Sequence, residues 1–276
     1  MIELNAGEAV AVVCPGDGGR IGALSVRGLP LLVTGDSSRD PMVWGCYPMV
    51  PFAGRVRDGR FMHEGRHVQL PLNLAPNAIH GTGFLSRWEV LDHGLDHVEL
   101  SCDLSWPLGG TAHQHIQLTP DAIVCVLTVV AGHDSMPVSI GYHPWFVKPV
   151  DDRLLFGSMF ELDGGGLPTG RLVEPMPRPW DDCFIDARKP LMLTLASPAR
   201  PGFTRHTLEV TIDSDCDHWV VFDRLDHSTC VEPQSAPPDA MNLGTAHVLS
   251  PGEMLQRTMT IAWHSSPPRP VPITDR

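Results

Sequence analysis

The chain contains 276 residues, of which 42% are hydrophobic and 19% are charged, and its formal net charge is −12 with the histidines neutral. A chain of this length can bury a sizeable core, and all-β sandwiches and barrels of about 200 to 250 residues commonly form one domain. The acidic balance argues against nucleic acid and anionic membrane surfaces as partners, because both attract basic proteins.

Proline and cysteine usage narrow the fold class and the compartment. The 27 prolines are about twice the usual share of ~5%, which disfavours long helices. The seven cysteines are scattered and contain no C-x-x-C pair, so neither a disulfide framework nor a zinc ribbon is expected. The N-terminus lacks the pattern of a signal peptide, and no apolar run approaches ~18 residues. We therefore expect a protein of the reducing cytoplasm.

Short apolar or alternating runs separated by turn residues predict antiparallel strands. Three pairs of runs predict hairpins: 10–13 with 20–26, 88–91 with 96–104, and 111–118 with 123–130. The run 96–104 alternates between apolar and polar residues, so one face should be buried and the other hydrated. The run 123–130 is apolar throughout, which predicts a central strand covered on both faces.

The second half of the chain is less regular. Further strands are predicted at 208–212, 219–222 and 259–263. Residues 147–206 are rich in proline, glycine and aspartate, and we expect long irregular connections there, of the kind that often carry function. No segment shows helical periodicity, and no linker divides the chain. These features predict one all-β domain over residues 1–264 and a proline-rich tail, extended or disordered, over 265–276.

His143 lies in the segment SIGYHPWF (139–146), between a glycine, a proline and three aromatic side chains. Aromatic faces cover the apolar C–H patches of a sugar ring, and an imidazole can exchange a proton near neutral pH. The proline after His143 favours an extended backbone, so the histidine should lie at a strand end rather than in a helix. A hydrogen-bonded core histidine is an equally good interpretation of this segment alone.

Three other segments supply side chains that could hold or convert a sugar. Arg55 follows a glycine in a loop-like context, where its planar fork of donors could bind hydroxyl groups. His80 precedes a glycine, which lets a ligand approach the backbone closely. Glu232 adjoins a proline and Gln234, and its position after an apolar run makes it a candidate for burial and a shifted pKa. Taken singly, each could equally be a structural or surface residue.

Other catalytic patterns fail on their spacing. His113 and His115 would share one face of a strand, but no glutamate follows at the distance that a cupin-like metal site requires. His63 and His67 have the spacing of ligands on a helix, yet a glycine between them indicates a turn. The glycine cluster at 15–19 lacks the lysine and the helix of a phosphate loop, and no Gly-x-Ser-x-Gly elbow occurs. The sequence predicts neither a metal nor a cofactor.

Motifs in both halves of the chain follow a fixed order. The first half contains PFAGRV (51–56), LPLN (70–73), NAIHG (77–81), GF (83–84) and Trp88. The second half contains GYHPWF (141–146), DDCF (181–184), VEPQ (231–234), PPDAMN (237–242) and LSPGE (249–253). In type and in order these motifs resemble those of the aldose 1-epimerases, also called galactose mutarotases, over about residues 48–263.

The resemblance implies a fold, an activity and roles for seven residues. The fold would be a large antiparallel β-sandwich of the galactose-mutarotase type, and the activity would be the interconversion of the α and β anomers of a free aldose. By matching motifs, Glu232 is expected to be the general base and His143 the general acid. Five residues are expected to bind or surround the sugar: Arg55, His80, Asp181, Trp145 and Gln234. Asp182 is an alternative to Asp181, and Trp145 stands where the family often has tyrosine.

The implied chemistry needs one proton acceptor and one proton donor. With unperturbed pKa values of about 4.3 for glutamate and about 6.5 for histidine, an ionised Glu232 and a His143 with a modestly raised pKa would serve at pH 7. No cofactor or metal is needed. The partner would be one monosaccharide, bound by a monomer or a homodimer.

Two alternatives use the same fold. A hexose-6-phosphate mutarotase would keep the acid and the base and add a basic cluster for the phosphate, for which Arg57 and Arg87 are the nearby candidates. A non-catalytic sugar-binding protein would keep the aromatic walls and Arg55 but could dispense with the acid and the base. The choice of aldose depends on loops within 147–206 and is left open by the sequence.

Overall fold

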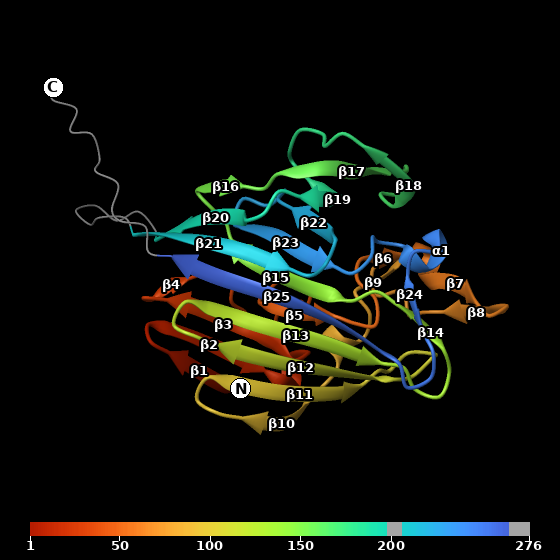
Figure 1. The fold of residues 1–276 in the computed structure, drawn as a ribbon, viewed down its shortest axis with the longest axis horizontal. Helices are drawn as coiled ribbons and strands as arrows, with labels where there is room; N and C mark the ends of the chain where they lie inside the picture. Colours follow the sequence, from red (N-terminus) through yellow and green to blue (C-terminus); the bar gives the residue numbers. More distant parts are fainter. Residues whose placement is uncertain (198–205, 265–276) are drawn as a thin grey trace.

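Two antiparallel sheets carry most of the chain in the computed structural model, which describes residues 1–197 and 206–264 (Figure 1). The larger sheet has eleven strands, in the spatial order β1 (Ile2–Ala6), β2 (Ala9–Cys14), β3 (Arg20–Val26), β5 (Cys46–Met49), β15 (Gly141–Val147), β23 (Ser228–Gln234), β22 (His218–Phe222), β19 (Asp181–Ala187), β17 (Phe156–Leu162) and β18 (Pro168–Val173), with β4 (Leu29–Pro30) added to β3. The smaller sheet has eight, in the order β10 (Glu89–His93), β11 (His97–Asp103), β12 (Thr111–Leu118), β13 (Ala122–Val130), β25 (Met254–His264), β21 (Thr207–Ser214), β20 (Leu191–Ala196) and β16 (Asp151–Arg153).

Short ladders and single helical turns complete the described residues. The ladders pair β6 (Arg55–Val56) with β9 (Ala78–Ile79), β7 (Arg60–His63) with β8 (Arg66–Gln69), and β14 (Met136–Val138) with β24 (His247–Leu249). The helical turns are η1 (Pro15–Asp17), η2 (Arg57–Gly59), η3 (Gly83–Leu85) and α1 (Ala240–Leu243). Within residues 1–197 and 206–264, every ladder between these strands is antiparallel, which confirms the predicted fold class.

The two sheets pack face to face, and strand alternation decides which side chains fill the space between them. The inward residues of β13 are fully buried: Ile123, Cys125, Leu127 and Val129. They share one core cluster with Tyr142 and Phe146 of the larger sheet. Removing each large aliphatic side chain from water contributes roughly 1.5 to 3 kcal/mol. The buried Gln114 also joins the sheets, because its Nε2 donates to the Gly19 carbonyl at 3.0 Å.

The three predicted hairpins are confirmed, because β2 pairs with β3, β10 with β11, and β12 with β13. The strands predicted at 208–212, 219–222 and 259–263 lie within β21, β22 and β25. One prediction for β13 is wrong. The strand is central, but Val124 and Val126 point to the outer face and are half-exposed. β-branched residues suit an exposed sheet face as well as a core, so an unbroken apolar run did not require two covered faces.

The prediction of long irregular connections over 147–206 is wrong for its described part. That range contains β16, β17, β18, β19 and β20. Several of its prolines and aspartates occupy turns and sheet edges, although Asp181, Asp182 and Asp186 lie in β19, an interior strand. Pro168, for example, begins β18 at the edge of the larger sheet, where a missing N–H removes no ladder hydrogen bond. The tail predicted over 265–276 lies outside the described residues.

The cysteines take no part in cross-links. All seven are free and buried, and burial raises the pKa of each thiol. In the described part of the chain, no helix combines the length and the apolar composition needed to cross a bilayer.

Candidate active site

Strand alternation gathers polar and aromatic side chains on the face of the larger sheet that is turned away from the main core. Along β15 every second side chain enters the core, so His143 and Trp145 point to the opposite face. The pairing register places His143 beside Tyr47 of β5. On its other side, the pairs that flank it in β23 place it opposite Glu232. Three segments that are far apart in the sequence thus form one transverse row.

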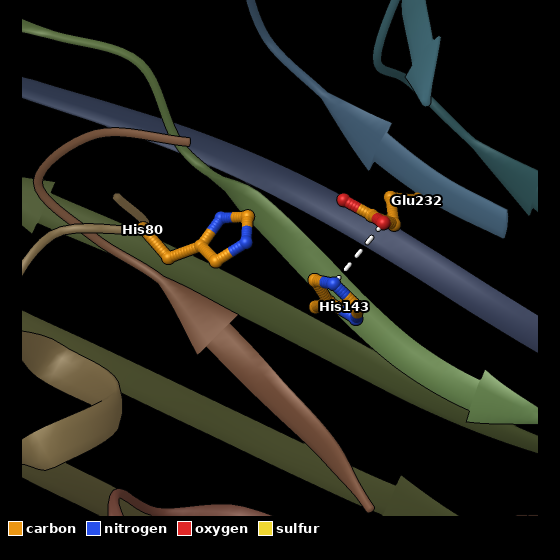
Figure 2. A group of neighbouring side chains, drawn as sticks. All are labelled: His80, His143 and Glu232. Carbon is orange, nitrogen blue, oxygen red and sulfur yellow. Dashed lines mark ion pairs between the residues drawn. The ribbon is translucent and has the colours of Figure 1, made fainter. Parts of the chain in front are cut away.

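Glu232 and His143 are in direct contact in this row (Figure 2). His143 Nε2 lies 3.1 Å from Glu232 Oε1, and the two side chains are only 7% and 3% exposed. The other carboxyl oxygen, Oε2, accepts a hydrogen bond from Gln234 Nε2 at 3.2 Å. The structure therefore brings together the carboxyl and imidazole groups that the sequence analysis singled out.

His80 approaches this pair from the loop that follows β9. Its φ is +59°, and that of Gly81 is +73°. A Cβ atom at Gly81 would lie 2.1 Å from the Val50 carbonyl oxygen, so only glycine fits there. The His80 N–H donates to the Gly54 carbonyl at 3.0 Å, and the Gly54 N–H donates to His80 Nδ1 at 3.3 Å. This tight turn directs the imidazole edge-on toward His143, with 5.0 Å between ring centroids (Figure 2).

The hydrogen bond from Gly54 also fixes the tautomer of His80. Because Nδ1 accepts a proton, the N–H of the neutral imidazole is on Nε2. Burial, then the neighbouring His143 and Arg55, lower the pKa of His80 well below its usual 6.5, so the ring is neutral at pH 7. His80 therefore offers an N–H donor to a ligand in front of it.

His80, His143 and Glu232 also form the one group among the described residues whose ligand atoms could surround a metal ion, since these atoms lie within 4.8 Å of one another. A metal needs an unprotonated nitrogen on each histidine. Freeing Nε2 of His80 would move its proton to Nδ1, where it would face the N–H of Gly54. The donor set does not fit a metal ion.

A cavity of about 320 Å³ lies over this row, at the small end of the range for ligand pockets. All seven predicted site residues line it: Arg55, His80, His143, Trp145, Asp181, Glu232 and Gln234. Sequence reasoning missed most of the apolar lining, which includes Met42, Val43, Tyr47 and Phe222. Only Tyr47 carried a usable signal, as an aromatic residue shortly before the PFAGRV motif.

Aromatic rings form one wall of the cavity. The Tyr47 ring stacks on His143, with centroids 4.7 Å apart and planes at 24°. The Trp145 ring stacks on His143 at 5.3 Å and 18°, and the edge of Phe222 meets Trp145 at 6.0 Å. Such faces can cover the C–H patches of a sugar ring.

Asp181, at the start of β19, lies at the more open side of the cavity. Its Oδ2 is 3.4 Å from Arg55 Nη2 and 4.0 Å from Arg224 Nη1. Asp182 does not line the cavity and instead accepts a hydrogen bond from the Asp181 N–H at 3.0 Å. Of the two aspartates, Asp181 is the one placed to meet a ligand.

The electrostatics of the central pair differ from the expectation. Burial, reinforced by Asp181, raises the pKa of Glu232 well above its usual range, although Gln234 and Arg55 oppose this shift. Burial lowers the pKa of His143 to about 3. The prediction of a modestly raised pKa for His143 is therefore wrong, and the shifts of both pKa values favour the neutral forms of the two groups.

Within the described part of the chain, Gln234 Oε1 is a buried polar atom of the cavity lining without a hydrogen-bond partner. Leaving such a group unpaired costs about 1 to 3 kcal/mol, which a ligand with hydroxyl groups could recover. The basic residues considered for a phosphate lie elsewhere. Arg57 pairs with Asp163 at 2.7 Å, and neither Arg57 nor Arg87 lines the cavity.

Comparisons with known proteins agree with this architecture. The sequence profile of the family described as aldose 1-epimerase matches residues 1–195. YphB of Escherichia coli K12, whose function is uncharacterised, is 31% identical over 160 residues, which are 55% of this chain and 54% of YphB. That alignment spans about half the length of this relative.

Solved structures share the fold along nearly the whole chain. A provisionally assigned aldose 1-epimerase from Escherichia coli K12 superposes with a TM-score of 0.81 at 22% identity, covering 96% of this chain and 98% of the other. A galactose mutarotase-like protein from Clostridium acetobutylicum gives 0.79 at 19% identity, covering 96% and 95%. A galactose 1-epimerase from Lactobacillus acidophilus gives 0.73 at 17% identity, covering 94% and 92%.

Proposed function

Because this chain belongs to the aldose 1-epimerase family, we propose that it interconverts the α and β anomers of a free aldose, with Glu232 and His143 exchanging the protons. One observation carries the proposal: the two groups touch at 3.1 Å on the buried floor of a cavity with aromatic walls. We further propose a cytoplasmic location, which the seven free cysteines support.

The reaction needs two proton transfers on one sugar. The O1 hydroxyl loses its proton while the ring oxygen gains one, the bond between C1 and the ring oxygen breaks, and an open-chain aldehyde forms. Rotation about the C1–C2 bond and reclosure then give the other anomer. A carboxylate and an imidazolium held side by side can serve both atoms of the same sugar.

With Glu232 protonated and His143 neutral, the forms that both pKa shifts favour, the pair can reach the reactive state without taking up a proton. Transfer of the proton from Glu232 to His143 across their 3.1 Å contact gives a carboxylate and an imidazolium. Sugar hydroxyl groups that donate to the carboxylate replace the solvation that burial removed, and Arg55 favours the same charge. Glu232 then takes the O1 proton and His143 protonates the ring oxygen. Ring opening leaves both groups neutral again, and reclosure reverses the transfers.

The remaining polar groups can bind and orient the sugar. The Nε2–H of His80 and the Arg55 guanidinium can donate to its oxygens, which stabilises negative charge that develops on them. Asp181 can accept from a hydroxyl group near the opening. Gln234 Oε1, which has no partner among the described residues, can supply one acceptor on the floor.

We expect kcat/KM to show a broad plateau with pH. Glu232 and His143 together hold one exchangeable proton. They take up a second proton only when the pH falls to the pKa of His143, about 3. They lose their shared proton only above the raised pKa of Glu232. Background-corrected polarimetry between pH 4 and 8 measures the profile. A narrow bell with limbs near about 4.3 and about 6.5, the unperturbed values, would contradict these shifts.

We expect the wild-type protein to accelerate the loss of optical rotation of at least one fresh aldose, tested with α-glucose, α-galactose and related sugars. Glucose 6-phosphate should respond weakly, because Arg57 and Arg87 lie outside the cavity. Polarimetry at matched concentrations measures both. A strong response to the phosphate alone would favour the hexose-6-phosphate alternative, and sugar binding by calorimetry without acceleration would favour a non-catalytic binding protein.

A further inference from the structure

The orientation of the His143 ring depends on very few polar contacts. Its Nε2 faces Glu232, while its buried Nδ1 has no hydrogen-bond partner on another described residue, and the ring's other polar contact is with the backbone of His143 itself. Catalytic histidines are usually oriented by a group that binds the second ring nitrogen. Here the remaining constraint is stacking, by Tyr47 from β5 and by Trp145 two residues along β15.

Tyr47 is held in turn by a buried arginine. Arg20, at the start of β3, is 0% exposed, and its guanidinium carbon lies 5.2 Å from the Tyr47 ring centroid and 4.3 Å from that of Trp44. Its Nε donates to the Asp17 carbonyl at 2.6 Å, its Nη1 to the carbonyls of Pro41 at 2.7 Å and Trp44 at 3.0 Å, and its Nη2 to that of Phe84 at 3.2 Å. The arginine thereby ties together the segments that surround Tyr47.

The charge of Arg20 is not neutralised by contact. All four of its acceptors are backbone carbonyls, and no carboxylate forms a salt bridge with it within residues 1–197 and 206–264. A buried positive charge is costly to keep without a counter-ion. One aromatic ring, that of Tyr47, separates this charge from the imidazole of His143.

We propose that Arg20 is a positioning residue for the proposed reaction: through Tyr47 it holds the His143 imidazole against Glu232. The inference rests on the proposed function. Two other titratable groups face His143: Glu232 from β23 contacts it, and His80 lies edge-on to it as a neutral ring. Asp181 and Arg55 influence the pair through their charges, which act on the pKa of Glu232. Arg20 is the cation that reaches His143 through Tyr47, and its field adds to burial in lowering the pKa of His143.

The test compares Arg20→Met, which removes the positive charge, with Arg20→Lys, which keeps the charge but cannot form all the hydrogen bonds of the guanidinium group. The imidazole of His143 is titrated by NMR in ¹⁵N-histidine protein, with its signals assigned from His143→Gln, and kcat and KM are measured in parallel. For Arg20→Met we expect the titration and the acid limb of kcat/KM to move upward by about one pH unit, the order of effect that loss of a nearby unit charge has at an effective dielectric constant of about 20. For Arg20→Lys we expect an unmoved titration and a kcat lowered about 10- to 100-fold, with KM little changed.

Arg27→Met is the matched control, because Arg27 is an exposed arginine beyond the other end of β3 that pairs with Glu8, and it should leave both readouts unchanged. A folded Arg20→Met protein with the wild-type titration and kcat overturns the proposal. If Arg20→Met does not fold, Tyr47→Leu decides: a kcat loss of about 10- to 100-fold at a nearly constant KM supports the proposal, and a wild-type kcat overturns it. If the wild type fails to accelerate anomer exchange, the proposed function fails, and the NMR titration still tests the action of Arg20 on His143.

Discussion

Glu232→Gln should reduce kcat for anomer exchange by about 10²- to 10⁴-fold, the usual contribution of a general acid or base. The amide has nearly the same shape as a protonated carboxyl group, so folding and sugar binding should change little. It cannot accept a proton from the O1 hydroxyl, so the chemical step should be lost. Saturation polarimetry measures kcat, and calorimetry with the unconverted sugar measures binding.

The smaller sheet offers a matched control. Glu99 and His115 are another glutamate and histidine in contact across neighbouring strands, at 3.4 Å, but on the outer face, where Glu99 is exposed and His115 is half-buried. Glu99→Gln should keep the wild-type rate. If Glu232→Gln is as fast as the wild type, Glu232 is not the base.

His143→Gln should lower kcat by a similar factor. The double variant, Glu232→Gln with His143→Gln, should have a kcat hardly lower than that of either single variant. The physical reason is that the two groups pass one proton between them and act as a unit, so removing either partner disables both transfers. The comparison uses kcat for the two single variants, the double variant and a His115→Gln control. Additive losses, with the double variant near the product of the two single effects, would show that the groups act independently.

The parts of the fold that the sequence predicted correctly depend on local patterns. Alternation and turn residues lie within a few positions of each other in the hairpins β2–β3 and β12–β13, so a short window was sufficient. The strands within 147–197 gain their stability from pairing with distant strands, as β19 does with β22. Proline, glycine and aspartate are common in turns, which is why this range was taken for irregular connections.

For the candidate site too, some features could be predicted from the sequence and others could not. The seven site residues could be named from motifs, because the relevant side chains stand in short recognisable runs. The pKa shifts of Glu232 and His143 could not be predicted from the sequence, because they depend on how deeply the pairing of β5, β15 and β23 buries the two side chains. Tyr47 and Arg20 were missed for a related reason: a tyrosine and an arginine in ordinary strands acquire a role only through neighbours from other segments.

The seven buried cysteines have a practical consequence for studying sugar entry. A thiol reacts as its thiolate, so thiols that are enclosed and hard to ionise will be slow toward alkylating dyes. An engineered cysteine on the surface can therefore be labelled without first removing the native ones. Asp40 is exposed at the rim of the cavity, and a fluorophore attached to Asp40→Cys would report the arrival of a ligand in real time.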